Sequence, residues 1–287
     1  VMAGAKPEYF PKILAIASTG RSSLFSSTTS FARMVVINGP IRSEIRMNSA
    51  LGAMGPFNHA NATIGRAWTL MSINLGGGAV PGETYMGSQG NNLNYNNVCF
   101  AENEERSPWE PFHIQKGFKR EENVVSLFSG WSYVNHTGLS EKYWRSNVIR
   151  VVSAFTPPGT TLGTEWLAPG SPGLQGGLTL LLDPLVARDF SEREKFDTKE
   201  ELSQWLYENT LVPVDQYWSL HLVHNFHKPL AEKGIEPYAS WSKLPNDTLI
   251  PVLATPDCIN IIVVGGGTNP IWLATDFGYL ESVSIDA

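Results

Sequence analysis

The chain has 287 residues, of which 42% are hydrophobic and 17% are charged, a composition typical of a folded globular protein with one large domain or two smaller ones. Its 21 lysines and arginines against 27 aspartates and glutamates give a net charge of -6, which argues against nucleic acid as a partner because binding along a duplex requires a broad basic surface. The longest aliphatic runs, 178–182 and 261–264, fall far short of the roughly 18 apolar residues that a membrane-spanning helix needs. We therefore expect a soluble protein with no membrane partner.

Two cysteines, Cys99 and Cys258, are too few for a disulfide framework, which favours a reducing compartment and therefore the cytoplasm. The first residues have neither the charged region nor the apolar core of a secretion signal. Because Val1 is not an initiator residue, we expect either a fragment or a processed product.

In chain order, the helical spacing of apolar residues predicts helices over 7–18, 62–75, 141–154 and 198–223. Asn61 is the expected N-cap of the second helix, and Thr198 with Glu201 has the spacing of a capping box at the start of the last one. Shorter apolar runs predict strands over 124–128 and 282–285.

A strand–turn–helix pattern occurs three times in the chain. In each case an apolar run leads into a polar or glycine turn and then to a proline at the first turn of a helical pattern, where proline loses no hydrogen bond. The apolar runs are 34–37, 178–182 and 259–264, and the expected helices after them are 41–47, 185–190 and 271–275. Because the apolar runs are continuous rather than alternating, we expect strands that are covered on both faces, as in parallel sheets.

The sequence therefore predicts an α/β fold of mostly parallel sheets flanked by helices, with room for two lobes. The proline-rich stretch 156–177 is the expected boundary between them. On this division, 1–155 forms an N-terminal α/β lobe and 178–287 forms a C-terminal α/β lobe.

The turns of the repeated pattern are the first candidate site. In open parallel sheets a ligand lies beyond the carboxyl ends of the strands, where helix N-termini face it. The candidate substrate-binding residues there are Asn38, Asp183, Gly266, Gly267, Thr268 and Asn269. The alternative is that these residue types stand here only because they suit turns.

A dinucleotide site is disfavoured, although Gly265 and Gly267 have part of its spacing and Asp286 follows a predicted strand. Pro270 stands where the third glycine should be, and the helix expected after it is short. The chain also has no Gly-Lys-Ser/Thr and hence no phosphate-binding loop of that type. The cofactor therefore stays unknown.

A second candidate site lies at the start of the helix expected near residue 62. His59 is a candidate general acid or base, as histidine side chains often are, while Asn61 and Arg66 are candidates for binding substrate. A guanidinium such as that of Arg66 can hold a carboxylate through two hydrogen bonds. Alternatively, Asn61 caps the helix, His59 packs against its neighbours and Arg66 is solvated.

A third candidate site is the segment 100–113, which concentrates four carboxylates with Arg106 and His113 among bulky apolar groups. A carboxylate buried beside an indole has a raised pKa and can act as a general acid or base. Glu102, Glu105 and His113 are therefore candidate catalytic residues, and Arg106 is a candidate for binding an anion. An acidic loop that is simply solvated is the alternative.

Three histidines, His221, His224 and His227, share one face of a helix at a spacing that would suit Zn²⁺. No carboxylate or cysteine stands nearby at ligand spacing, so we expect no metal and keep these histidines as the alternative. The cysteines lack CxxC spacing, and no Gly-x-Ser-x-Gly marks a serine nucleophile.

Several long segments together resemble a bacterial family that accompanies small thiol or selenol proteins bearing a UGSC or CGSC motif, which are themselves similar to glycine and proline reductase subunits. These segments are 3–11, 36–40, 58–66, 100–113 and 263–270. The resemblance covers most of the chain and implies a cytoplasmic α/β component of a redox or thiol-dependent enzyme. It also implies a cysteine at the position of Ala5 and more chain before it. If that cysteine is catalytic in the family, this chain is inactive or uses the thiol of a partner.

We therefore expect an oxidoreductase subunit that works with a separate small Cys or Sec protein, in an oligomer or hetero-complex, on a small anionic substrate. In this hypothesis Arg66 and Arg106 hold the anion, and His59 or His113 moves the proton. The turns at Asn38 and 265–269 form the floor of the cleft. Two alternatives stay open: a stand-alone lyase or hydrolase that uses the carboxylates of 102–110, with or without a metal at the histidines, and a noncatalytic scaffold subunit.

Overall fold

The computed structural model describes residues 1–24, 31–75, 82, 87, 89–138, 142–155 and 177–286. The expected boundary between lobes, 156–177, lies outside the described residues except for Gly177. The division of the chain at this boundary therefore stays a prediction.

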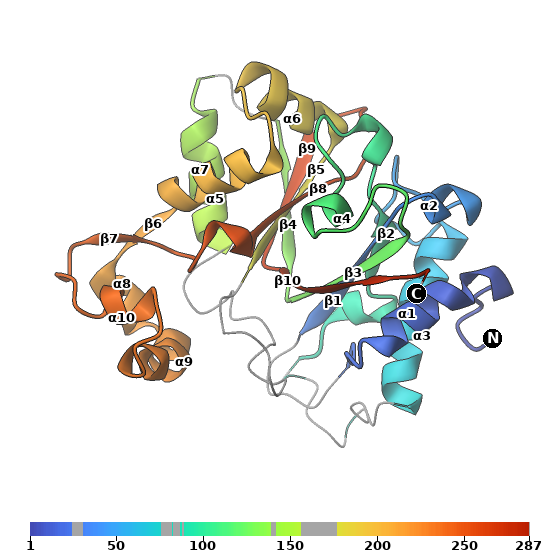
Figure 1. Cartoon of the computed structure of the whole chain (residues 1–287), viewed down its shortest axis with the longest axis horizontal. Coiled ribbons are helices and arrows are strands. Elements are labelled where there is room, and N and C mark those ends of the chain that lie inside the picture. Colours follow the sequence, from blue (N-terminus) through green and yellow to red (C-terminus); the bar gives the residue numbers. More distant parts are fainter. Residues whose placement is uncertain are drawn as a thin grey trace.

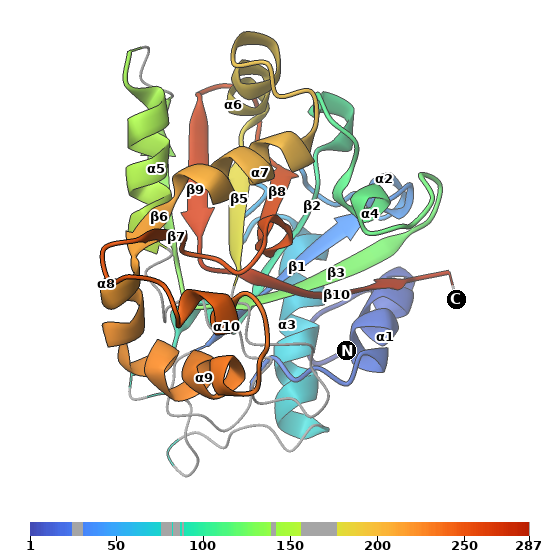
Figure 2. The ribbon, with the colours of Figure 1, turned by 60° about the vertical axis from the view of Figure 1, so that its left-hand side comes forward.

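The described strands form two mixed four-stranded sheets and a two-stranded one (Figure 1). Their bounds are β1 Ala32–Asn38, β2 Val98–Ala101, β3 Val124–Gly130, β4 Tyr133–Thr137, β5 Leu178–Leu182, β6 Leu211–Pro213, β7 Leu249–Pro251, β8 Ile259–Val263, β9 Ile271–Thr275 and β10 Gly278–Ser284. The first sheet has the order β10-β3-β1-β2 and the second has the order β4-β9-β5-β8, while β6 pairs with β7. The strands of the second sheet run steeply across those of the first (Figure 2).

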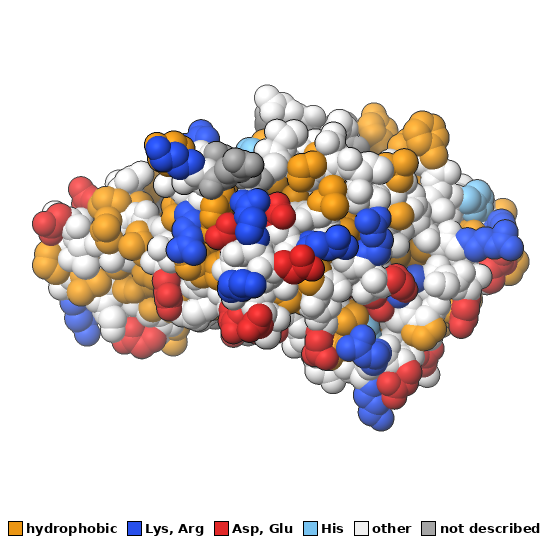
Figure 3. All heavy atoms as spheres, turned by 90° about the horizontal axis from the view of Figure 1, so that it is seen from above, with side chains coloured by type: hydrophobic (Ala, Val, Ile, Leu, Met, Phe, Trp, Pro, Cys, Tyr) orange, Lys and Arg blue, Asp and Glu red, His pale blue; other side chains and the backbone are white. Residues whose placement is uncertain are grey.

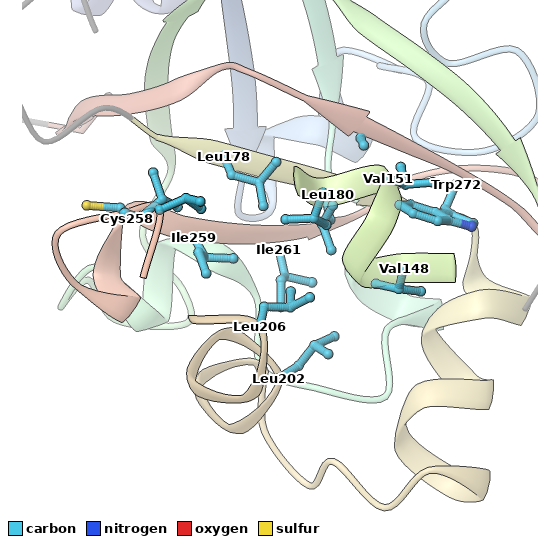
Figure 4. Close-up of a cluster of buried hydrophobic side chains, with 14 of the residues drawn as sticks. Val148, Val151, Leu178, Leu180, Leu202, Leu206, Cys258, Ile259, Ile261 and Trp272 are labelled. Carbon is cyan, nitrogen blue, oxygen red and sulfur yellow. The ribbon is translucent and has the colours of Figure 1, made fainter. Parts of the chain in front are cut away.

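The bounds of the α-helices are α1 Phe10–Ser18, α2 Ile41–Glu44, α3 His59–Asn74, α4 Phe112–Gln115, α5 Trp144–Phe155, α6 Pro184–Arg188, α7 Lys199–Asn209, α8 Val214–Ser219, α9 His221–Glu232 and α10 Tyr238–Trp241. Helices α1 and α3 cover the outer face of the first large sheet and α5 and α7 that of the second, while α8, α9 and α10 pack on one another beside β6 (Figure 1). On the first sheet, Ile16 of α1 and Ile64 of α3 join a core with Val35 and Val125. On the second sheet, the side chains of β5 and β8 point toward Leu202 and Leu206 of α7 (Figure 4).

The inner faces of the two sheets meet in a third apolar core. Met34 and Phe128 of the first sheet belong to it together with Leu181 and Ile262 of the second. The result is a layered α/β/β/α arrangement, in which the central strands of both large sheets are covered on both faces and the edge strand β4 is largely exposed. This double coverage explains the continuous apolar runs of the sequence.

The α/β class is thus correct, but the prediction of mostly parallel sheets is not confirmed. Of the strand pairs described, β1–β2 and β5–β8 are parallel. The antiparallel pairs are β1–β3, β3–β10, β4–β9, β5–β9 and β6–β7. A continuous apolar run reports that a strand is covered on both faces, and an antiparallel strand inside a layered structure meets the same condition.

Each large sheet also takes one strand from the other half of the chain, so two separate lobes are not confirmed. The chain crosses from β3 to β4 and again from β9 to β10, and these two crossings lie against each other. Asp276 Oδ1 accepts hydrogen bonds from the backbone N–H groups of Trp131 and Ser132 at 2.8 and 2.9 Å. A Cβ on Gly130 would lie 2.8 Å from the Asp276 carbonyl oxygen, so only glycine fits at this corner.

Several predicted elements are correct and three are not. The first two strand–turn–helix units are present as β1 with α2 and β5 with α6. In the third unit the predicted helix 271–275 is strand β9, because its Ile, Trp and Thr suit a strand that lies between β4 and β5. The predicted helix 198–223 begins with the expected capping box but ends at Asn209, before Pro213.

The third correction concerns α3, which begins at His59 and not at 62. Asn58 is its N-cap and accepts a hydrogen bond from the Asn61 backbone N–H. Asn61 therefore lies inside the first turn, and its side chain does not cap the helix.

Candidate functional site

A pocket of about 350 Å³ lies beyond the carboxyl ends of the parallel strands β5 and β8. We call it the glycine-loop pocket, because the loop 265–269 forms one of its sides. Of the predicted site residues, Asp183, Gly266, Thr268 and Asn269 line it. Apolar residues such as Leu181 form much of the remaining wall, so the pocket combines an apolar interior with a few polar groups.

The segment 50–55 forms another wall of the glycine-loop pocket. Asn61 holds this segment in place: its amide donates to the carbonyl oxygens of Asn48 and Ala53 at 2.9 and 3.0 Å, and its oxygen accepts from the Asn48 N–H at 3.1 Å. Asn61 is 2% exposed and is not among the pocket-lining residues. It is therefore a positioning residue for the wall and does not contact a ligand in the pocket.

The glycine loop is held from both sides. Asp183 Oδ1 caps α6 by accepting from the Leu185 N–H, while Oδ2 accepts from the Gly267 N–H at 2.9 Å. On the other side Arg106, which is exposed, donates to the Gly266 carbonyl oxygen. A Cβ on Gly265 would lie 2.5 Å from Asp183 Oδ2, and both Gly265 and Gly267 have positive φ values. Close approach and backbone conformation thus require these glycines without any bound phosphate.

The structure also disfavours a dinucleotide site at the glycine loop. Strand β9 follows the glycine loop, so no helix N-terminus stands there to bind a pyrophosphate. Asp286 accepts from Asn123 instead, through its backbone and side-chain nitrogens.

Three of the other predicted residues, Asn38, Glu102 and His113, meet in a buried polar cluster at the end of β1. All three are completely buried. Asn38 donates to Glu102 Oε2 and Glu104 Oε1 at 2.7 and 2.8 Å, and its own Oδ1 has no partner among the described residues. His113 Nδ1 lies 4.0 Å from Glu104 Oε1.

Glu102 is saturated with donors. Its Oε2 accepts from Asn38 and from the Phe112 N–H at 2.7 Å, and its Oε1 accepts from Lys199 Nζ at 2.8 Å. A carboxylate that is fully buried and accepts bonds at both oxygens has no face left for a substrate. Its position therefore favours a structural role over general acid–base work.

Glu105 lies at the exposed side of the same cluster. Both of its oxygens accept from Arg42, at 2.8 and 3.3 Å. Hydrogen bonding to the Arg42 guanidinium lowers the pKa of the Glu105 carboxyl below its ordinary value. A carboxyl that stays ionised in this way is a poor general acid near neutral pH.

The structure places His59 and Arg66 neither at the glycine-loop pocket nor in the buried polar cluster. His59 is exposed at the start of α3, and its Nδ1 lies 3.4 Å from the Tyr9 hydroxyl. Arg66 Nη1 donates to the Tyr95 carbonyl oxygen at 2.8 Å. Neither residue lines a described pocket.

The histidine triplet is only partly described, because the side chain of His221 lies outside the described residues. His224 is exposed, whereas His227 is buried, bonds the Tyr217 hydroxyl and stacks on Tyr238. Within the described part of the chain, no group of three or more His, Cys, Asp or Glu residues could hold a metal ion.

Both cysteines are free and buried. Burial raises the pKa of the Cys99 thiol to about 12, so this thiol is protonated and inert at neutral pH. Neither cysteine lines the glycine-loop pocket. Ala5, where the resemblance implies a cysteine, packs against the core between α1, α3 and the first sheet.

Lys199 and Arg42 are two of the buried charges that the sequence patterns missed, and a signal for both was available. Each basic side chain lies in the first turn of its helix, α7 or α2, where a cation opposes the helix dipole. A basic residue at such a position indicates that a nearby negative charge compensates the unfavourable interaction with the helix dipole. Asn103 was also missed: its amide donates to the Gly265 carbonyl oxygen at 2.9 Å.

Comparisons of the chain with protein-family models, with curated proteins and with solved structures found no match. None of the described helices is both long and apolar enough to cross a membrane. On the face shown in Figure 3, the described basic side chains are interspersed with acidic ones.

Proposed function

We propose that this chain is the substrate-binding component of a thiol- or selenol-dependent enzyme, and that the glycine-loop pocket holds a small anionic substrate for reductive chemistry. The observation that carries the proposal is the convergence of Asp183, Gly266, Thr268 and Asn269 on one pocket. A mostly apolar hollow with a few convergent polar groups is the usual form of a small-molecule site.

The charge preference of the substrate rests on Arg106. Its guanidinium is not part of the pocket lining, but it is exposed beside the glycine loop and uses Nη1 for the Gly266 carbonyl oxygen, so its remaining N–H groups are available to an anion next to that loop. Asp183 is the acidic residue of the pocket, but each of its oxygens already accepts a backbone N–H. Its negative charge is therefore partly offset.

The thiol of the proposed reaction comes from a second chain, because Cys99 and Cys258 are both buried away from the pocket. A pair of thiols, or a thiol and a selenol, on a small Cys or Sec protein supplies two electrons to the substrate and ends as a disulfide or selenenyl sulfide. Such a pair stays reduced in the cytoplasm, which is the location that we propose.

The burial of Glu102 and His113 weighs against the alternative of a stand-alone lyase or hydrolase. A general acid or base must come within hydrogen-bond reach of its substrate. The same pocket weighs against a noncatalytic scaffold subunit, which needs no small-molecule site.

Reconstitution with the partner tests the proposed function. The tagged chain is isolated from cells that produce it natively, the small Cys or Sec protein that accompanies it is identified by mass spectrometry, and both are purified. Consumption of dithiothreitol is then measured with a panel of small carboxylates and phosphate esters. We expect consumption that requires both chains and falls at least about tenfold in Arg106→Met.

Two matched variants, Arg120→Met and Arg66→Met, serve as controls, because Arg120 pairs with Glu110 and Arg66 donates to Tyr95, whereas Arg106 donates to the glycine loop. Both should turn over like the unmodified chain. Turnover by the chain alone would support the lyase or hydrolase. A stable complex that binds no small molecule and shows no turnover would support the scaffold.

A further inference from the structure

A second pocket, of about 380 Å³, lies beside the outer edge of β8. We call it the β8-edge pocket. It is separate from the glycine-loop pocket, since the two share none of their lining residues. Its walls come from α4, α7 and the segment just before β8, and polar side chains make up most of the lining: Gln115, Lys116, Lys199, Glu200, Ser203, Gln204, Asp257 and Asn260.

The edge of β8 is covered at both ends but open in the middle. The Ser203 hydroxyl donates to the Ile259 carbonyl oxygen at 3.0 Å. At the other end, the Asn103 N–H donates to the Val263 carbonyl oxygen at 2.8 Å. Because backbone groups alternate in direction along a strand, those of Ile261 face the same side, where Ile261 lines the pocket. The gap of one residue suits a small molecule and is too short for a peptide strand.

Asn260 lines this pocket and has a buried acceptor without a donor in the described part of the chain. It is 2% exposed, and its Oδ1 has no partner among the described residues. The orientation of the amide is fixed by its nitrogen, which lies 3.3 Å from the Leu178 carbonyl oxygen and 3.5 Å from that of Cys258. Reversing the amide would place oxygen against two carbonyl oxygens. A buried acceptor without a donor is costly, so Oδ1 calls for a donor from a bound molecule.

Lys116 lines the same pocket and has an ammonium group without a direct ion pair among the described residues. Its Nζ lies 4.9 Å from the ring centroid of Phe112 and 4.4 Å from that of Tyr279. It makes no ion pair with any carboxylate in the part of the chain that the structure describes. Burial lowers the pKa of this ammonium, and the nearby charges of Asp257 and Glu200 offset only part of that effect, so a carboxylate in direct contact would raise the pKa further. Lys199, by contrast, is already paired with Glu102 at 2.8 Å.

The charges at the pocket limit the anion that fits. Glu200 and Asp257 are exposed and line the same pocket, so they repel a dianion such as phosphate more strongly than a monoanion. The donor that meets Asn260 is expected to be neutral, because a charged ammonium at a site this buried would lose its hydration. These conditions describe a singly charged carboxylate with a hydroxyl group.

We propose that the β8-edge pocket binds a small hydroxycarboxylate, whose carboxylate pairs with Lys116 and whose hydroxyl donates to Asn260. The two residues come from different layers of the fold, one at the end of α4 and one on β8, so the ligand bridges the first sheet's side of the molecule and the edge of the second sheet. Gln115 and Gln204 also line the wall, where their amide nitrogens donate to Glu200 and Glu208, respectively.

Calorimetry on the full chain tests this proposal with matched probes. 2-Hydroxybutanoate and its homologues of three to six carbons are compared with butanoate, which lacks the hydroxyl, and with 2-hydroxybutanamide, which lacks the charge. We expect saturable binding of at least one hydroxy acid, weakened at least about tenfold by loss of either group. Lys116→Met should weaken it to the same extent, and Lys119→Met, an exposed lysine on the same loop, should not.

Amide chemical shifts of the unmodified chain provide a readout that does not depend on how a variant folds. The Asn260 side-chain amide and the Ile261 N–H should shift on addition of the hydroxy acid, while Thr268 and Asn269 of the glycine-loop pocket should not. Absence of saturable binding by every hydroxy acid up to 10 mM, on the order of the weakest affinity that small ligands show, would overturn the proposal. Shifts confined to Thr268 and Asn269, or equal binding of butanoate, would overturn it as well.

Discussion

Lys199 Nζ lies 2.8 Å from Glu102 Oε1, and the two side chains are 1% and 0% exposed. The pair joins the first turn of α7, which covers the second sheet, to the residue that follows β2 of the first sheet. Glu102 also accepts from Asn38 and from the Phe112 backbone. The pair is therefore the centre of a polar connection between the two sheets. Its removal should lower the free energy of unfolding of the whole chain.

Lys199→Met should lower the free energy of unfolding by about 3–5 kcal/mol, because it leaves the Glu102 carboxylate buried without its cation. Urea denaturation followed by tryptophan fluorescence measures the change. The double variant with Glu102→Gln removes the orphaned charge and should recover part of the loss. Lys243→Met, at an exposed lysine, is the control; a loss as small as that of the control would show that the pair does not hold the sheets together.

Asp276 should make stability depend on pH. Burial is the main cause that raises the pKa of this carboxyl from 3.8 to about 6. A folded-state pKa above the unfolded value means that the contribution to stability is complete below about pH 4 and is lost as the pH rises through about 6. The loss between these limits is on the order of 3 kcal/mol.

Asp276→Asn tests this dependence, since its amide oxygen can still accept from Trp131 and Ser132. Thermal unfolding from pH 4 to pH 7 should show a flatter profile in this variant and a higher melting temperature near neutral pH. The exposed Asp247→Asn should keep the profile of the unmodified chain. Parallel profiles for all three proteins would refute the assignment to Asp276.

The thiols of Cys99 and Cys258 should be unreactive in the folded chain. Both are buried, and burial raises the pKa of Cys99 to about 12, so very little thiolate exists at pH 8. Ellman's reagent should modify them at least about 100-fold more slowly than in 6 M guanidinium, the condition that exposes a buried thiol fully. One thiol that reacts at the unfolded rate would mean that the chain can supply its own nucleophile, and the requirement for a partner's thiol would no longer follow.

Gly65 on α3 should tolerate no side chain. A Cβ there would lie 1.9 Å from the Asn96 backbone carbonyl oxygen, so Gly65→Ala forces α3 away from the segment before β2 and should cost about 3 kcal/mol or more. Gly52→Ala is the comparison variant, in which backbone strain acts without a clash. Gly52 has a φ of +72° and nothing within 4 Å of a Cβ, so this substitution should lower the free energy of unfolding by about 1 kcal/mol. Chemical denaturation should rank the two variants in this order, and equal losses would show that packing at α3 adapts.

Much of the fold could be predicted where the determinants are local. The strands β1 and β5, the turns after them and the capping box of α7 depend on residues within a few positions of one another, so their patterns are complete in the sequence. The third strand–turn–helix unit failed because Pro270 and an apolar run suit a strand as well as a helix. Pairing with β4 and β5 decided between the two.

The candidate site divides in the same way. The strand-end argument placed Asp183, Thr268, Asn269 and Asn38 around one cleft. The first three do line one pocket, because the carboxyl ends of β5 and β8 lie at one edge. Asn38 does not, because β1 belongs to the other sheet and Asn38 is buried against Glu102.

The same argument could not place Arg66, whose position is set by how α3 packs, nor show that Asn61 would hold a wall of the pocket. The strand-end argument also gave no reason to consider Asn260, although Asn260 is a polar residue within the apolar run 259–264 of the sequence.

The sequence alone thus determined an α/β protein with buried strands, two of its strand–turn–helix units and a glycine loop near a polar turn, since each of these depends on neighbours along the chain. Only the tertiary structure decided which charges are buried together. Lys199 and Glu102 are separated by 97 positions, and no local pattern links them. Their meeting depends on the two sheets packing face to face, because a charge can remain in such an interior only where the fold brings a partner to it.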